Sequence, residues 1–82
     1  QIVNCSTFDQ SKNCLLTAKG STITFHKVSE NSHFEADFGE ETINRVSFCP
    51  SVIDLVIVLG EKGLLRIGRL EGDRVIWIGQ KE

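Results

Sequence analysis

Several residue types are scarce among the 82 residues of this sequence, which has no methionine, no tyrosine, one tryptophan, one proline and three cysteines. The cysteines form neither a Cys-x-x-Cys pair nor an alternation with histidine, so they suggest neither a disulfide framework nor a zinc site. We therefore expect Cys5, Cys14 and Cys49 to be buried thiols of a protein in a reducing compartment, the cytoplasm or the nucleus. We expect no metal and no cofactor.

Neither sign of charge predominates, because 11 acidic residues stand against 9 basic ones and give a net charge of −2. Nucleic-acid binding requires a dense Lys/Arg footprint, and the sequence has no basic cluster, so we expect no nucleic-acid partner. The longest unbroken apolar stretch, Leu55 to Leu59, is far shorter than the ~20 residues of a membrane-spanning helix. We therefore expect one small, soluble domain with no membrane partner, and we find no basic-then-apolar leader that would predict a signal peptide.

Helical periodicity is almost absent from the sequence. Short runs rich in β-branched and aromatic residues alternate with Gly, Asn, Ser and Asp, a pattern typical of strands and turns. The connections are short enough to make consecutive strands antiparallel neighbours. The sequence therefore predicts an all-β meander of eight strands, at Ile2–Phe8, Cys14–Ala18, Thr22–Val28, His33–Phe38, Asn44–Phe48, Leu55–Leu59, Leu64–Leu70 and Arg74–Ile78.

The sequence also contains an internal repeat of about 40 residues. With a shift of 40 positions, later 42 because one turn is longer, the equivalent pairs include Asn4 and Asn44, Phe8 and Phe48, Leu16 and Val56, Ala18 and Val58, Ile23 and Leu65, and Phe25 and Ile67. Four strands in a unit of this length are typical of a propeller blade. We predict two copies, residues 1–41 and residues 42–82, which together form part of one propeller domain.

The second copy contains segments that resemble a known family. Val46-Ser47-Phe48-Cys49-Pro50 is similar to the first strand and turn of a WD-repeat blade, Leu55 to Gly60 to its second strand, and Gly63 to Leu70 to its third. The Trp-Asp dipeptide of the family is replaced by His26-Lys27 and Gly68-Arg69, so the blades are degenerate. The resemblance covers both copies and implies two four-stranded antiparallel blades of a WD-repeat-like β-propeller.

The way in which such blades pack leads to a further expectation about neighbouring blades. A blade has an apolar face on each side and cannot cover both by itself. Cys14–Ala18 and Leu55–Leu59 are apolar at consecutive positions, which predicts burial on both sides. Because a closed ring takes about 4–8 blades, we expect either a piece of a longer propeller or a two-blade protomer that completes a ring with other copies.

The candidate site lies in the connecting loops. In a propeller, the loops between second and third strands and the links between blades share one face of the ring, where many propellers engage partners. The exposed residues that we predict to contact protein partners are Lys19, Ser21, Glu40, Glu41, Arg45, Glu61 and Lys62. Gly60 and Gly63 are expected to supply positive φ in a hairpin.

Other motifs favour structural roles. Cys14 and His26 could be a nucleophile and its base, but no segment offers an oxyanion hole, so we expect a buried thiol and no enzyme. Asn4-Cys5-Ser6 matches a glycosylation sequon inside a predicted strand, where a structural asparagine is favoured. Trp77 is expected to pack in the core or at a seam.

Two functions stay open. The resemblance implies a non-catalytic protein–protein interaction scaffold within a larger assembly, whose partners include the remaining blades in the same chain or in another. The alternative is a two-blade protomer that oligomerises into a ring and binds a glycan or another small ligand between its blades.

Overall fold

The computed structural model describes residues 3–10, 13–52 and 54–82, and in this part of the chain it contains all eight predicted strands. The elements in chain order are β1 (Cys5–Asp9), β2 (Cys14–Lys19), β3 (Thr22–Lys27), the 3₁₀ turn η1 (Val28–Glu30), β4 (Ser32–Asp37), β5 (Ile43–Phe48), β6 (Leu55–Gly60), β7 (Leu65–Glu71) and β8 (Arg74–Lys81). Val28, expected in a strand, begins η1 instead, which ends on Asn31 in the left-handed conformation. No helix in the described part is long and apolar enough to cross a membrane.

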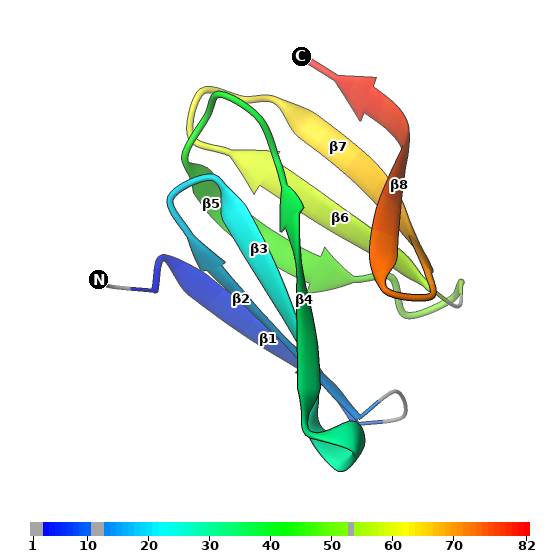
Figure 1. Cartoon of the computed structure of the whole chain (residues 1–82). Coiled ribbons are helices and arrows are strands. Elements are labelled where there is room, and N and C mark those ends of the chain that lie inside the picture. Colours follow the sequence, from blue (N-terminus) through cyan, green and yellow to red (C-terminus); the bar gives the residue numbers. More distant parts are fainter. Residues whose placement is uncertain (1–2, 11–12, 53) are drawn as a thin grey trace.

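The strands form two four-stranded antiparallel sheets, which we call sheet A (β1-β2-β3-β4) and sheet B (β5-β6-β7-β8) (Figure 1). Within each sheet, every strand pairs with its neighbours in sequence because the turns between them are short, whereas β4 and β5, expected to be antiparallel neighbours, lie in different sheets. Within residues 3–10, 13–52 and 54–82 no ladder joins the two sheets, and neither sheet closes into a barrel. The boundary predicted between residues 41 and 42 falls in the segment that joins the sheets.

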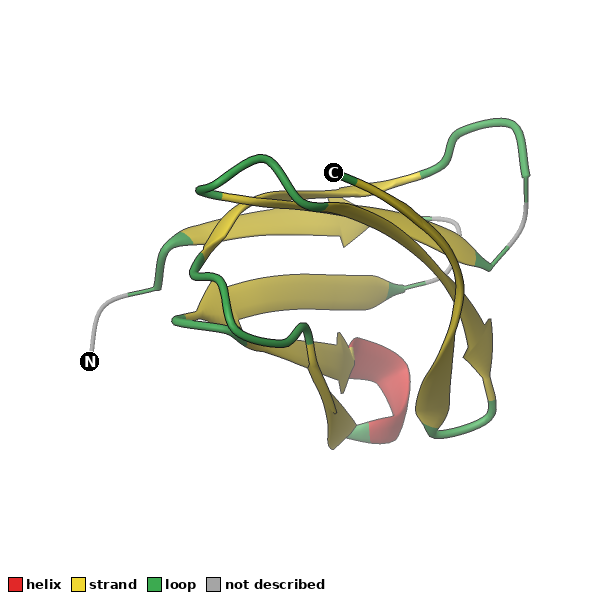
Figure 2. Ribbon diagram, turned by 90° about the horizontal axis from the view of Figure 1, so that it is seen from above, coloured by secondary structure: helices red, strands yellow, loops and turns green. Residues whose placement is uncertain are grey.

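The two sheets lie face to face as two layers (Figure 2). Their first strands, β1 and β5, contact each other, and so do their last strands, β4 and β8. The backbone N–H of Ile43 at the start of β5 donates to Gly20 O in the β2–β3 turn at 2.8 Å. The first strands of the two sheets therefore lie over each other, and so do the last strands, so the front of sheet A meets the back of sheet B.

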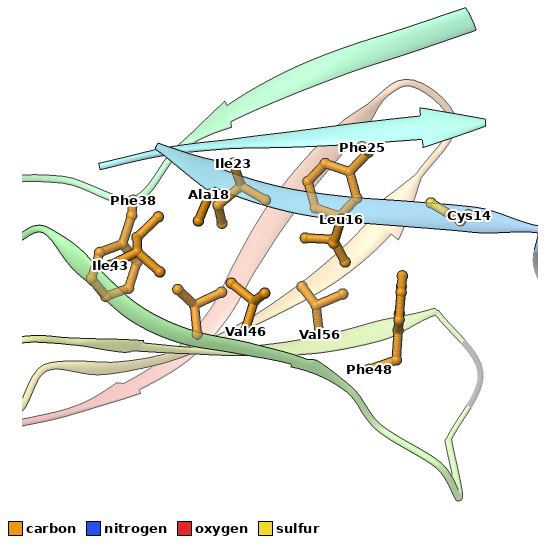
Figure 3. Packing of buried hydrophobic residues seen from close by; sticks show 11 residues of the cluster. Cys14, Leu16, Ala18, Ile23, Phe25, Phe38, Ile43, Val46, Phe48 and Val56 are labelled. Carbon is orange, nitrogen blue, oxygen red and sulfur yellow. The ribbon is translucent and has the colours of Figure 1, made fainter. Parts of the chain in front are cut away.

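The hydrophobic core fills the space between the sheets. Sheet A contributes Leu16, Ala18, Ile23 and Phe25, and sheet B or the segment leading to it contributes Phe38, Ile43, Val46, Phe48, Val56 and Val58, with Cys14 at one end of the row. Leu16 points from β2 toward Val46 and Val56 (Figure 3). Because side chains alternate along each strand, every second side chain lies in this core. Short strands with only three inward residues each are therefore enough to form the core.

The prediction that β2 and β6 are buried on both sides assumes neighbouring blades, so in the chain alone one side of each strand is expected to stay open. Residues on their inward sides are buried, whereas those on their outward sides, such as Leu15 and Ile57, are half-buried. The outward sides also differ between the sheets. In sheet A this side carries threonine, histidine and acidic residues beside Leu15 and Phe8, so among the described residues an open apolar face is found on sheet B and not on sheet A.

The repeat register also needs correction at the second strand. Leu16 lies opposite Phe25 in sheet A, so both side chains share a face. In sheet B, Ile67 lies opposite Ile57, while Val56 lies opposite Gly68. Ile57 is therefore the structural equivalent of Leu16 when Ile67 is that of Phe25. The alternation of apolar residues hid this shift, because Val56 and Ile57 are equally hydrophobic.

Candidate partner-binding face

Three connections meet at one end of the two sheets: the β2–β3 turn, the β4–β5 link and the β6–β7 turn. We call the surface formed by residues 19–21, 38–42 and 60–64 the turn face. Phe38 N–H donates to Ser21 O at 2.8 Å, and Glu61 N–H donates to Thr42 O at 2.9 Å. These bonds fix the β4–β5 link between the two turns, so the three connections form one rigid surface.

The side chain of Asn4 links the β2–β3 turn to the first residue of β5. Its Nδ2 donates to Gly20 O and to Ile43 O, both at 3.1 Å, and its backbone N–H donates to Ala18 O at 2.7 Å. Both amide hydrogens are therefore used to hold the start of sheet B against sheet A. Asn4 thus has the structural role that we favoured over glycosylation.

Glu41 has a structural role that the sequence did not reveal. Its Oε1 accepts hydrogen bonds from the backbone N–H groups of Lys62, at 2.8 Å, and Leu64, at 3.4 Å. The carboxylate thereby satisfies two donors of the β6–β7 turn and is half-buried. Because Glu41 Oε1 is engaged in these two hydrogen bonds, Glu41 fixes the shape of the turn face.

Gly60 allows this arrangement by its small size and not by its φ angle. Its φ is not positive, so the expectation of positive φ is wrong at this position, whereas Gly63 adopts φ +100° as expected. A Cβ at Gly60 would collide with Glu41 Oε1 and lie 2.9 Å from Phe38 Cε2. The glycine is therefore required by the close approach of the β4–β5 link.

The structure places the seven predicted partner-binding residues on different surfaces. Glu40, Glu61 and Lys62 are exposed on the turn face, where Ser21 and Glu41 are half-buried. Lys19 ends β2 opposite Thr22, at the edge between the turn face and the outward side of sheet A. Arg45 lies in β5 opposite Leu59, on the outward side of sheet B. The turn face therefore brings together six of the seven residues, and Arg45 belongs to another surface.

A cluster around Arg66 supports the turn face from inside. Arg66 Nη1 donates to Phe38 O and Nε donates to Gln80 Oε1 at 3.1 Å, while the guanidinium carbon lies 5.5 Å and 5.8 Å from the ring centroids of Phe38 and Trp77. Trp77 Nε1 donates to Asp37 O at 3.3 Å, and its ring meets Phe38 edge to face. Trp77 thus packs at the seam, as predicted. Nothing in the local pattern marked Arg66, because its inward direction follows only from the register of β7.

A charged hollow of about 370 Å³ lies beside this cluster. It is lined by Gly39, Glu40, Glu41, Leu64, Arg66, Gln80 and Glu82. Acidic groups from the β4–β5 link and the C-terminal residue thus surround one guanidinium that is already hydrogen-bonded. The hollow is suited to polar contacts with another protein surface.

The Cys14–His26 pairing is excluded by the register of sheet A. Cys14 lies opposite Lys27, while His26 lies opposite Leu15, so the thiol and the imidazole are on opposite faces of the sheet. Cys14 is 6% exposed, and His26 Nε2 lies 3.3 Å from Thr17 Oγ1. Burial raises the pKa of the Cys5 thiol, which lowers the fraction of reactive thiolate at neutral pH.

Comparisons with protein-family models, with curated proteins and with solved structures find no match to this chain. Within the residues that the structure describes, no group of three or more His, Cys, Asp or Glu side chains could hold a metal ion.

Proposed function

We propose that this protein is a non-catalytic scaffold for protein–protein interactions, a two-blade segment of a WD-repeat-like propeller in a larger cytoplasmic or nuclear assembly. The turn face is its partner-binding surface. The proposal rests on the hydrogen bonds that hold three connections from the two sheets together. These bonds keep the exposed residues Glu40, Glu61 and Lys62 in fixed positions.

The chemistry of the turn face supports binding to another protein. Its exposed groups are of both charge signs and stand around a polar hollow, so they suit a partner with complementary charges. The loops need no ordering on binding, because backbone bonds and the Glu41 carboxylate already hold them. The Arg66 and Trp77 contacts beneath them resist deformation of the face.

Affinity capture with single charge reversals tests this proposal. The bait is the full chain, incubated with extract of the cells that produce it, and Lys62→Glu and Lys19→Glu are compared with the wild type. Arg74→Glu is the matched control, because Arg74 is an exposed cation at the β7–β8 turn, at the opposite end of the strands.

We expect the wild type and the control to recover the same defined set of proteins. The turn-face variants should recover about tenfold less of that set, or lower still. Recovery of that set by all variants alike would contradict a partner-binding role of the turn face.

One observation favours the alternative, a ring-forming protomer that binds a small ligand. A hollow of about 410 Å³ opens between the sheets at the end opposite the turn face. Sheet A contributes Cys14, Lys27 and Phe34 to its lining, and sheet B contributes Leu70. Saturable binding of a glycan or metabolite to an oligomer of the chain, with no protein recovered, would favour this function.

A further inference from the structure

The outward side of sheet B is an aliphatic surface. Its members come from three adjacent strands and are Leu55, Ile57, Leu59, Leu65, Ile67 and Ile76, which we call the aliphatic face. All six are half-buried in the chain alone. The outward side of sheet A carries threonines, histidines and acids beside Leu15 and Phe8, so within the described residues it is not an aliphatic surface of this kind.

The aliphatic face is the structural counterpart of the side of sheet A that receives sheet B. Three cross-strand pairs in sheet A, Cys14 with Lys27, Leu16 with Phe25 and Ala18 with Ile23, form that inward side. They correspond to Leu55 with Arg69, Ile57 with Ile67 and Leu59 with Leu65. Because the sheets stack front to back, the inward side of sheet A and the outward side of sheet B face the same direction along the stack.

The polar connections between the sheets have counterparts as well. Lys27 Nζ donates to Asp73 Oδ1 in the β7–β8 turn at 2.8 Å. Arg69, whose Nε donates to Glu71 Oε2 at 2.8 Å, occupies the position equivalent to Lys27. Asn4 Nδ2 binds the first residue of β5, and its repeat equivalent is Asn44, which is exposed. Sheet B therefore repeats both the apolar surface and the polar groups with which sheet A holds its neighbour.

From this correspondence we infer that the aliphatic face docks a further four-stranded sheet, whose facing side resembles the inward side of sheet B. Arg69 then meets an acidic residue in the last turn of that sheet, and Asn44 binds the backbone at its start. This inference rests on the propeller segment in our proposed function, and it adds which surface takes the next blade.

A chain extended by one repeat tests the inference. A second copy of residues 38–82 is placed directly after Lys81, so that it carries its own β4–β5 link and presents the inward side of a second sheet B. The extended chain is compared with the 82-residue chain by thermal unfolding, each with and without Ile67→Asp in the original copy. A matched extension with Val46→Asp and Val58→Asp in the added copy controls for chain length.

If the inference holds, the unmodified extension raises the unfolding midpoint of the original sheets by about 5–10 °C, and the matched extension does not. Ile67→Asp then lowers the midpoint at least about twice as much in the extended chain as in the 82-residue chain, because the carboxylate is buried only there. Thr24→Asp, on the outward side of sheet A, has the same effect in both chains.

Equal midpoints with and without the added repeat would overturn the inference. So would a dimer of the 82-residue chain that Ile67→Asp dissociates, because a second copy would then occupy the aliphatic face. Binding of the chain to neutral phosphatidylcholine vesicles through Ile67 would also overturn it. None of these results depends on the turn face, so they are distinguishable from a failure of the proposed scaffold function.

Discussion

Glu41 shows how far a residue's role can depend on contacts distant in sequence. Its neighbour Glu40 has the same side chain and is exposed, yet Glu41 alone reaches the N–H groups of the β6–β7 turn, which is 21 residues away. A carboxylate that accepts backbone hydrogen bonds leaves those donors unsatisfied when it is removed. The two adjacent acids are therefore a natural pair for comparison.

We predict that Glu41→Ala lowers the free energy of unfolding by about 1–2 kcal/mol, and that Glu40→Ala changes it by less than about 0.5 kcal/mol. Urea unfolding followed by Trp77 fluorescence measures both values. Equal effects of the two substitutions would contradict the structural role of Glu41.

The same residues show what the sequence could and could not predict about the site. The pattern of strands and turns was enough to place Glu61 and Lys62 in an exposed turn, because alternation and turn residues are local signals. It could not separate Glu41 from Glu40, or find Arg66, because these roles depend on the register of strands and on the path of the β4–β5 link.

At the scale of elements, the β7–β8 hairpin depends on a glycine inside a strand. Gly68 lies opposite Trp77 on the inward side of sheet B, and a Cβ there would lie 2.6 Å from Val75 Cγ1 and 3.1 Å from Trp77 Cε3. A Cβ at Gly79, in the neighbouring strand, would point into open space, with nothing within 4 Å beyond its own chain neighbours. The two glycines thus offer a matched pair in the same hairpin.

We predict that Gly68→Ala destabilises the protein by about 1–3 kcal/mol and shifts the emission of Trp77 to longer wavelength, because the indole must move outward. Gly79→Ala should leave both the emission maximum and the unfolding midpoint nearly unchanged. Unaltered Trp77 emission in the Gly68 variant would show that the ring does not pack on this glycine.

The element scale is also where the sequence was most informative and where its predictions needed correction. The strands follow from short apolar runs and short turns, and the structure confirms their antiparallel order within each sheet, whereas β4 and β5, also expected to be antiparallel neighbours, lie in different sheets. The equivalence of Leu16 with Val56 was wrong, because a shift of one residue exchanges the two faces of a strand and a wholly apolar run gives no sign of it.

At the scale of the whole molecule, an ion pair links the two sheets at the end opposite the turn face. Lys27 Nζ lies 2.8 Å from Asp73 Oδ1, and this hydrogen bond raises the pKa of Lys27 above its ordinary value near 10.5. A lysine with a raised pKa in the folded state stabilises that state fully below its unfolded pKa, and the contribution is lost as pH rises through the folded value.

We therefore predict that the difference in unfolding midpoint between the wild type and Asp73→Asn is constant from pH 7 to about 9.5 and shrinks above about 10.5. Salt reduces the difference as well, because the pair is exposed. The Cys5 thiol titrates in both proteins, so its contribution to the pH dependence cancels in the difference between them. A difference that grows at high pH would contradict the assignment.

The central claim is that Leu16 and Ala18 of sheet A pack against Val46 and Val56 of sheet B, which leaves Ile57 and Ile67 on the outside. Methyl–methyl nuclear Overhauser effects measure this directly in the full chain. We predict cross-peaks from Leu16 to Val46 and Val56. Cross-peaks from Leu16 to Ile57 or Ile67 instead would show that the sheets stack through other faces and would contradict the claim.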